Sequence, residues 1–226
     1  MQVTNLAYFY ESARKVRGGK WVWVKDSNGE ARNNVLLGGT ILNPNKGFGH
    51  LWAAQLVQYT PAEGCLIFRS FAIADASGAS ATTIKIAGDG YSDAPEVGML
   101  LMVAPDDVTT TGQSAKVTAV TYDAANEVFN VTIDTALGAL AIGDILVEAL
   151  GDDGDASDED VVLVPNPNTF VEADRDLMPT EGFGIENANY SISTVYNKQA
   201  WIARMQPLPK YVLAKNRSYI EGIFWI

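Results

Sequence analysis

The sequence predicts a mainly β protein, in which a small β-barrel or sandwich domain is inserted in a larger β-rich body and one short helix lies near the N-terminus. Short runs of β-branched and aromatic residues recur along the chain, and clusters of Gly, Pro, Asn and Asp separate them. Such runs and clusters are typical of strands and turns. Of the 226 residues, 47% are hydrophobic and 19% charged, which is enough apolar material for a sizeable core.

A helical pattern occupies residues 5–17. Apolar side chains there recur at spacings of three and four, which predicts an amphipathic helix of about three turns. Phe9 and Tyr10 form an aromatic stripe on its apolar face, and Gly18-Gly19 ends it. The stripe is expected to pack either on the protein's own core or on a neighbouring subunit.

Strands are predicted near both ends of the chain. Trp21-Val22-Trp23-Val24, followed by a turn at Asn28-Gly29, is a strong strand-and-turn signal. Toward the C-terminus, strands are predicted at residues 190–196, 200–205 and 211–214.

The central part of the chain reads as strands only. Residues 75–81 are small and polar, which predicts a linker. Five short apolar or alternating runs follow between residues 82 and 149, as expected for a small barrel or sandwich. The predicted domains are therefore a β-rich body made of residues 1–75 together with 151–226, and an insertion domain at residues 76–150.

The insertion domain contains a weak internal echo. An alternating strand is twice followed by a glycine, Gly98 or Gly143, that opens a second apolar strand. Glycine permits a turn or bulge that a Cβ atom would obstruct. A pseudo-symmetric duplication and the common pattern of small barrels both explain the echo, and the second is favoured.

Charge and cysteine usage restrict the partners. The net charge of −11 disfavours nucleic acid, and the basic residues between 14 and 20 are interpreted as a solvated helix face. Cys65, the single cysteine, reads as a small buried hydrophobe. No apolar run reaches the roughly 18 residues of a membrane span, and the first twenty residues lack the apolar stretch of a signal peptide. We expect synthesis in a cytosol and no membrane partner.

The residues give little support to catalysis. His50, the sole histidine, lies in a glycine-rich segment predicted to be a loop, and nothing near it resembles a nucleophile elbow. The acidic run at residues 151–160 places oxygen ligands at alternate positions, as calcium loops do. However, Asp158 stands where an EF-hand has its glycine, and Val164 stands where it has its glutamate. A solvated loop is therefore favoured, and no catalytic residue, metal or cofactor is expected.

Aromatic residues near both chain ends have no evident place in a core. Chain termini are usually polar unless they are tied down, and exposed aromatic patches commonly mark interfaces. A final core strand within one monomer explains any single patch about as well. Taken together, the patches favour a homo-oligomer with these interface residues: Phe9, Tyr10, Trp21, Trp23, Phe224 and Trp225.

Three segments resemble a known group of proteins. Ala74 to Ile86, with Thr82-Thr83-Ile84-Lys85-Ile86, followed by Val97-Gly98-Met99-Leu100, resembles small β domains of tailed-phage head proteins. Residues 134–146 look like the closing half of the same pattern. The upstream Leu37-Gly38-Gly39-Thr40-Ile41-Leu42 is similar to a strand of capsid decoration and head-fibre proteins. The resemblance departs at Met99, where the pattern prefers Asp.

The resemblance implies a virion protein, either a head fibre or a capsid-associated decoration component. Such proteins are commonly symmetric and often trimeric, contact other phage capsid proteins, and are made in the bacterial host cytoplasm. The expected function is therefore that of a phage or prophage structural protein that is not an enzyme. Two rivals stay open: a host-surface adhesin whose Tyr91 or Trp52 stacks on glycan rings, and a hydrolase that uses acidic residues.

Overall fold

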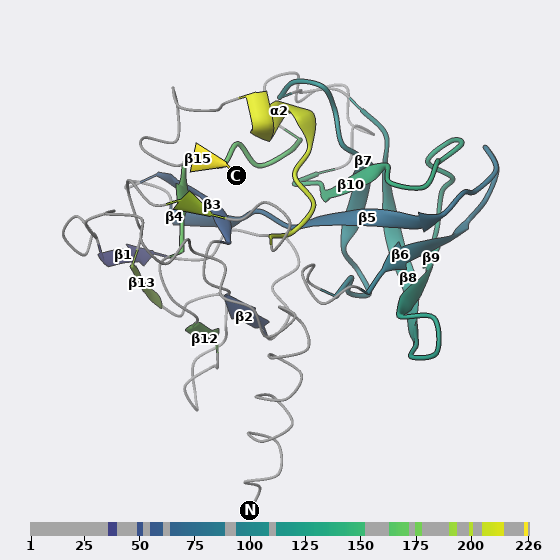
Figure 1. The fold of residues 1–226 in the computed structure, drawn as a ribbon, viewed down its shortest axis with the longest axis horizontal. Coiled ribbons are helices and arrows are strands. Elements are labelled where there is room, and N and C mark those ends of the chain that lie inside the picture. Colours follow the sequence, from purple (N-terminus) through teal and green to yellow (C-terminus); the bar gives the residue numbers. More distant parts are fainter. Residues whose placement is uncertain are drawn as a thin grey trace, which may run out of the picture.

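The computed structural model confirms a mainly β fold, since the described part of the chain is mostly strand with very little helix (Figure 1). The predicted helix at residues 5–17 lies outside the described residues. The structure describes residues 36–39, 49–51, 55–60, 64–88, 94–108, 112–151, 163–171, 175–177, 190–193, 199–200, 205–214 and 224–225.

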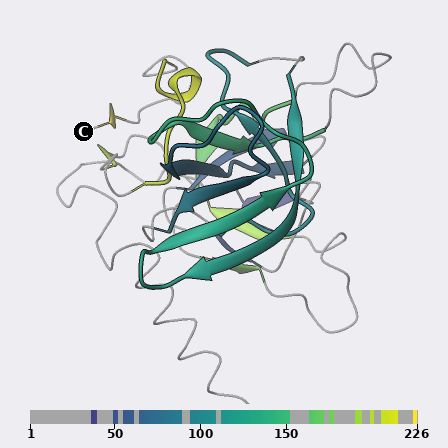
Figure 2. The same cartoon turned by 90° about the vertical axis from the view of Figure 1, so that its right-hand side faces the viewer.

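Six antiparallel strands close into a barrel in the order β10-β5-β6-β9-β8-β7, on the right of Figure 1 and facing the viewer in Figure 2. Strands β7, β8 and β9 follow one another, and β10 returns beside β7, which is a Greek-key arrangement. The first barrel strand starts before the boundary predicted at residue 75. The barrel strands are β5 (Ser70–Asp75), β6 (Thr83–Ala87), β7 (Leu100–Val103), β8 (Ser114–Asp123), β9 (Val128–Ile133) and β10 (Ile145–Glu148).

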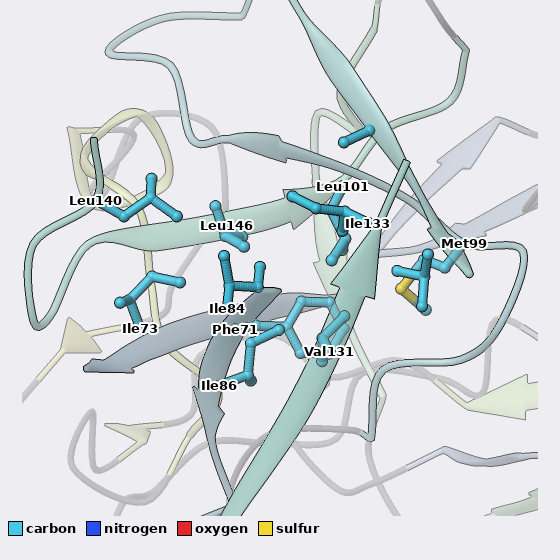
Figure 3. Close-up of a cluster of buried hydrophobic side chains, with 12 residues drawn as sticks. Phe71, Ile73, Ile84, Ile86, Met99, Leu101, Val131, Ile133, Leu140 and Leu146 are labelled. Carbon is cyan, nitrogen blue, oxygen red and sulfur yellow. The ribbon is translucent and has the colours of Figure 1, made fainter. Parts of the chain in front are cut away.

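Alternation along the strands fills the barrel interior. In β6, Ile84 and Ile86 are buried while Thr83 and Lys85 are exposed, as a period of two requires. Figure 3 shows side chains from several strands pointing toward one another inside the barrel. This barrel core contains Phe71, Ile73, Ile84, Ile86, Met99, Leu101, Ala115, Val117, Val131, Ile133, Leu140 and Leu146.

The barrel consists of two equivalent halves, β5–β6–β7 and β8–β9–β10. Each half is a hairpin followed by a third strand that crosses to the other half, since β7 pairs with β8 and β10 pairs with β5. The registers correspond residue by residue: Leu146 lies opposite Phe71, and Leu101 lies opposite Ala115. The two halves are therefore related by a pseudo-two-fold axis.

The turns and bulges repeat as well. Each half has a register shift, one after Ile73 and one after Val117. Gly98 N–H donates to the carbonyl of Val117 at 2.8 Å, and Gly143 N–H donates to that of Ile73 at 2.9 Å. Both glycines have positive φ, +94° and +88°, which a side chain would disfavour. The internal echo is thus a pseudo-symmetric repeat, contrary to the interpretation favoured from sequence.

Outside the barrel, strands from before and after it pair with one another. Among the described residues there are four small sheets, in which β1 pairs with β13, β2 with β12, β3 with both β4 and β11, and β14 with β15. We refer to this part, with the helix α2, as the body. Its elements are β1 (Leu36–Gly39), β2 (Gly49–Leu51), β3 (Leu56–Thr60), β4 (Gly64–Ile67), β11 (Thr169–Phe170), β12 (Arg175–Leu177), β13 (Tyr190–Ser193), β14 (Gln199–Ala200), α2 (Lys210–Ala214) and β15 (Phe224–Trp225).

The strand predicted at residues 211–214 is wrong, because α2 occupies this segment. The carbonyl of Pro209 accepts hydrogen bonds from the N–H groups of Val212 and Leu213, which closes a helical turn. A run of four apolar residues is too short to distinguish a period of two from one of 3.6. Tyr211 and Val212 are buried by this turn.

A second apolar cluster joins the barrel to the body. In β7 and β10, Leu101 and Leu146 point into the barrel, while their neighbours Met102 and Val147 belong to a cluster on the outer face. These two strands are therefore buried on both sides, and their outer face is covered by the body. The cluster contains Leu56, Phe68, Met102, Val147, Ala149, Leu163, Val164, Met205, Leu208, Tyr211 and Val212.

Candidate functional site

A buried ion pair lies where the barrel meets the body. Arg69 sits between β4 and β5, and Glu148 ends β10. The Arg69 Nε donates to Glu148 Oε2 at 2.7 Å and a terminal nitrogen donates to Oε1 at 2.6 Å, which is a bidentate pair. Their side chains are 9% and 1% exposed. Burial makes the pair costly to break, since either charge left alone would be poorly solvated.

A second carboxylate completes this charge cluster. Glu96 Oε1 accepts from Arg69 at 3.3 Å, and Glu96 is also the first residue of the turn that contains Gly98. The backbone N–H of Glu148 donates to the carbonyl of Arg69 at 3.0 Å. One guanidinium therefore connects the start of β5, the end of β10 and the turn before β7. This arrangement is expected of a side chain whose role is to stabilise the junction between these elements.

The segment before α2 is hydrogen-bonded to the same junction between the barrel and the body. Gln206, which is 2% exposed, donates from Nε2 to the carbonyl of Phe68 at 2.8 Å. The Ser70 hydroxyl donates to the carbonyl of Pro207, and the Tyr211 hydroxyl donates to that of Pro165 at 3.1 Å. Burial raises the pKa of Tyr211 well above its usual value, so its hydroxyl stays protonated. These bonds join residues far apart in sequence, and the Ser70 bond ties the segment to the barrel strand β5.

The sequence interpretation missed this charge cluster. Arg69 follows the apolar run that ends with Phe68, and Glu148 ends the apolar run of β10. Charged residues are rarely fully buried unless they are paired. An Arg and a Glu next to apolar runs were thus an available signal, but their separation of 79 positions in the sequence left the partner unspecified.

Exposed apolar side chains on the barrel are candidate contact points. Val97 and Ile142 are 61% and 70% exposed. They occupy the same place in the two equivalent turns, each just before the glycine of positive φ. Their exposure therefore recurs in both halves of the barrel.

An aromatic pair marks the long hairpin β8–β9. Tyr122, which is 51% exposed, lies 4.8 Å from Phe129 between ring centroids. A Cβ on Gly88 would come within 2.8 Å of the Tyr122 ring and of the carbonyl oxygen of Glu127. Gly88 thus permits the ring to lie against the neighbouring strand. The pair stabilises the hairpin and leaves part of the Tyr122 ring open to solvent.

Most predicted interface residues lie outside the described residues, namely Phe9, Tyr10, Trp21 and Trp23. Phe224 and Trp225 form β15, which pairs in parallel with β14. The backbone near the C-terminus is therefore tied to its own chain, and the interface role of these two side chains stays a prediction.

The other predicted functional residues are placed as follows. Tyr91, Trp52 and the acidic run at residues 152–160 lie outside the described residues. His50 lies in β2 opposite Asp176 of β12, so the prediction that it lies in a loop is wrong. Among the described residues, no group of three or more His, Cys, Asp or Glu is placed to hold a metal ion.

Cys65 of β4 is buried, which raises the pKa of its thiol to about 12. We expect it to react with a thiol reagent at pH 8 only when the protein unfolds, because the thiolate is the reactive form. The stability contributed by the buried neutral thiol should be complete below pH 9 and lost as the pH rises further, since the unfolded thiol ionises first. Labelling rates across a urea titration test this; fast labelling of the native protein would contradict it.

In the described part of the chain, no helix has the length and apolarity needed to cross a membrane. No family model matches the sequence, and no curated protein matches it either.

Proposed function

We propose that this chain is a structural protein of a tailed-phage or prophage particle, a capsid-associated or head-fibre component that acts by subunit assembly. The observation that carries the proposal is the closed barrel, filled with apolar side chains and fastened to the body by an apolar cluster and a buried ion pair. A module of this kind is suited to hold a fixed position in an assembly rather than to catalyse the turnover of a substrate. The resemblance of residues 74–146 to phage head domains supports the same conclusion.

The proposal includes a domain arrangement. The barrel is an insertion domain at residues 76–150, extended by β5, within a β-rich body made of residues 1–75 and 151–226, and residues 5–17 form a helix. The pairing of β1, β2 and β3 with β13, β12 and β11 supports a body assembled from both sides of the barrel.

The proposed partners are further copies of the chain, often as a trimer, and other capsid proteins of the virion. The exposed Val97 and Ile142 support contacts made through the barrel turns, since apolar side chains at a surface gain stability when a partner covers them. The aromatic residues near the chain ends supply the proposed contacts between copies.

Replacing Phe224, Trp225 and Ile226 with serine is expected to lower the mass of the oligomer or its solubility, because the apolar end would lose its contacts with neighbouring copies. Light scattering after size-exclusion chromatography measures the mass. A matched control replaces the exposed Ala124 and Ala125 with serine and should change nothing. An unchanged oligomer with an unchanged melting temperature would refute the interface role.

A glycan-binding adhesin is the second candidate function, and the half-exposed ring of Tyr122 favours it. A glycan array separates the two functions. Binding that is lost in Tyr122→Ala but retained in Lys116→Ala would support the adhesin, since Lys116 is an exposed residue of the same strand.

A further inference from the structure

We propose that a second copy of this chain adds to the barrel sheet at an open edge of β8, over residues 118–124, by antiparallel pairing about a two-fold axis at Thr121. The two copies would then share one continuous sheet. The inference deepens the proposed function by naming a contact between copies, and it rests on that function only for the need to assemble.

The edge is open because β8 is longer than the strand beside it. On that side β7 pairs only with residues 114–116. Val117 makes the last backbone bonds there: its N–H donates to the carbonyl of Met99 and its carbonyl accepts from the N–H of Gly98, both at 2.8 Å. Among the described residues, no strand continues on this side, while β9 accompanies β8 as far as Asp123 on the other. In Figure 1 the β8–β9 hairpin projects from the barrel at the lower right.

The backbone bonds of β9 show which of its residues face β8. The N–H of Asp134 donates to the carbonyl of Lys116, which precedes the open edge in β8. The N–H of Ile133 donates the other way, to the carbonyl of Thr82 next to β6. Successive residues of a strand direct their backbone groups to opposite sides. The even-numbered residues of β9 therefore face β8, and the odd-numbered ones face β6.

The register then identifies the backbone groups at the open edge. Ala119 and Thr121 lie opposite the even-numbered residues 132 and 130 of β9, so their backbone groups bond to β9. Val120 and Tyr122, which alternate with them, direct their N–H and carbonyl groups to the open side. These are the groups that an added strand would bond.

The edge lacks the features that usually keep strands from pairing. Edge strands are commonly blocked by Lys, by Pro or by a covering segment. Residues 118–122 read Thr-Ala-Val-Thr-Tyr, with high β propensity and without charge, Pro or Gly. Thr118 and Thr121 are exposed, and Tyr122 is 51% exposed. The edge is therefore accessible to an extended strand.

The end of the open stretch sets the register of the pairing. An incoming strand cannot extend past Thr118, because the backbone of Val117 is already bonded to the segment before β7. Pairing about Thr121 places position 124 of the second copy, where its hairpin turns, opposite position 118. Val120 of each copy then lies opposite Tyr122 of the other, and both residues direct their backbone groups to the shared edge. A two-fold axis at Val120 would instead bring the second copy onto the occupied position 117.

A second copy fits this edge because the edge complements itself. The pair of Val120 with Tyr122 occurs twice across the axis, and cross-strand pairs of a β-branched and an aromatic residue stabilise sheets. Each pair covers a Tyr122 ring that is exposed in the single chain. The chain has a net charge of −11, but the paired stretch carries no charge at the axis. An interface that uses the same patch of both copies is isologous.

The two barrels do not compete for space in this arrangement. Residues 114–117 of β8, which close the barrel on β7 and the turn before it, lie on one side of the paired stretch. Because the strands run antiparallel, the corresponding residues of the second copy lie at the opposite end. The barrels are therefore placed end to end along the joined strands.

The first test places one cysteine at the axis. Thr121→Cys with Cys65→Ala brings two thiols together in a non-hydrogen-bonded pair, whose Cα atoms lie about 4.5 Å apart, a separation that a disulfide can span. The control is Thr83→Cys with Cys65→Ala, since Thr83 is also exposed but lies on β6, beyond β9. In a glutathione buffer we expect the Thr121→Cys variant to form a covalent dimer at least about tenfold faster than the control, because pairing raises the effective concentration of the thiols.

The second test places like charges at the axis. Thr121→Lys should raise the dissociation constant of the dimer by about fivefold, since like charges directly opposite each other destabilise a strand pair. Thr83→Lys is the matched control and should leave the constant unchanged. Sedimentation equilibrium measures the constant, and circular dichroism shows that both variants are folded. If Thr121→Lys does not fold, the cysteine pair still decides.

Three results would overturn the proposal. The first is equal rates of disulfide formation in the two cysteine variants, and the second is a folded Thr121→Lys variant with the dissociation constant of the wild type. The third is a disulfide from position 121 to an added capsid protein in place of a second copy. If the chain still forms oligomers without this contact, the proposed function stands and only the edge pairing is wrong.

Discussion

Arg69→Met is expected to lower the free energy of unfolding by about 3–5 kcal/mol, the loss typical when one partner of a buried ion pair is removed. Glu148, whose side chain is 1% exposed, would lose both of its bonds to the guanidinium while its carboxylate stays buried in the protein. Urea unfolding followed by tryptophan fluorescence measures the change.

Two controls show whether the loss of stability comes from the buried charge of Glu148. Glu96→Gln should cost far less, because Glu96 is 30% exposed and makes the longer contact. The double variant Arg69→Met with Glu148→Leu should recover much of the stability, since an apolar pair of similar volume leaves no buried charge. A single variant as stable as the wild type would show that the cluster does not fasten the barrel.

Phe71→Ala is expected to destabilise the protein by about 3–5 kcal/mol, because Phe71 is fully buried in the barrel core and truncation leaves a cavity. The equivalent position in the other half is Ala115. Ala115→Phe alone should also destabilise, by about 1–3 kcal/mol, since it overfills the same core.

The double variant Phe71→Ala with Ala115→Phe tests the pseudo-symmetry. It exchanges a large and a small residue between equivalent places, so the total core volume is unchanged. We expect its stability to lie within about 1.5 kcal/mol of the wild type, as volume-conserving changes usually do. Thermal and urea unfolding measure it. If the double variant loses as much stability as the two single variants together, positions 71 and 115 do not compensate for each other within one core.

Local alternation made the barrel strands predictable from sequence. Ile84 and Ile86 alternate with Thr83 and Lys85, and the structure buries the isoleucines and exposes the other two. The glycines that open β7 and β10 were visible as an echo, because both turns require positive φ. Alternation carries no information about which strands pair, so the strand order came only from the structure.

The candidate site was less predictable because it is non-local. The ion pair joins residues 69 and 148, and no spacing rule connects them. Tyr211 and Val212 looked like a strand by composition, yet hydrogen bonds to Pro209 and burial against the outer cluster favour a helical turn. Tertiary packing thus overrode the local preference of this short run.

Light scattering across a range of protein concentrations tests most directly the proposal that the chain acts by assembling with further copies of itself or with other capsid proteins. A mass that rises to a multiple of 24.3 kDa is the predicted result. A mass that stays at the single-chain value up to millimolar protein, and also when phage capsid proteins are added, would contradict it.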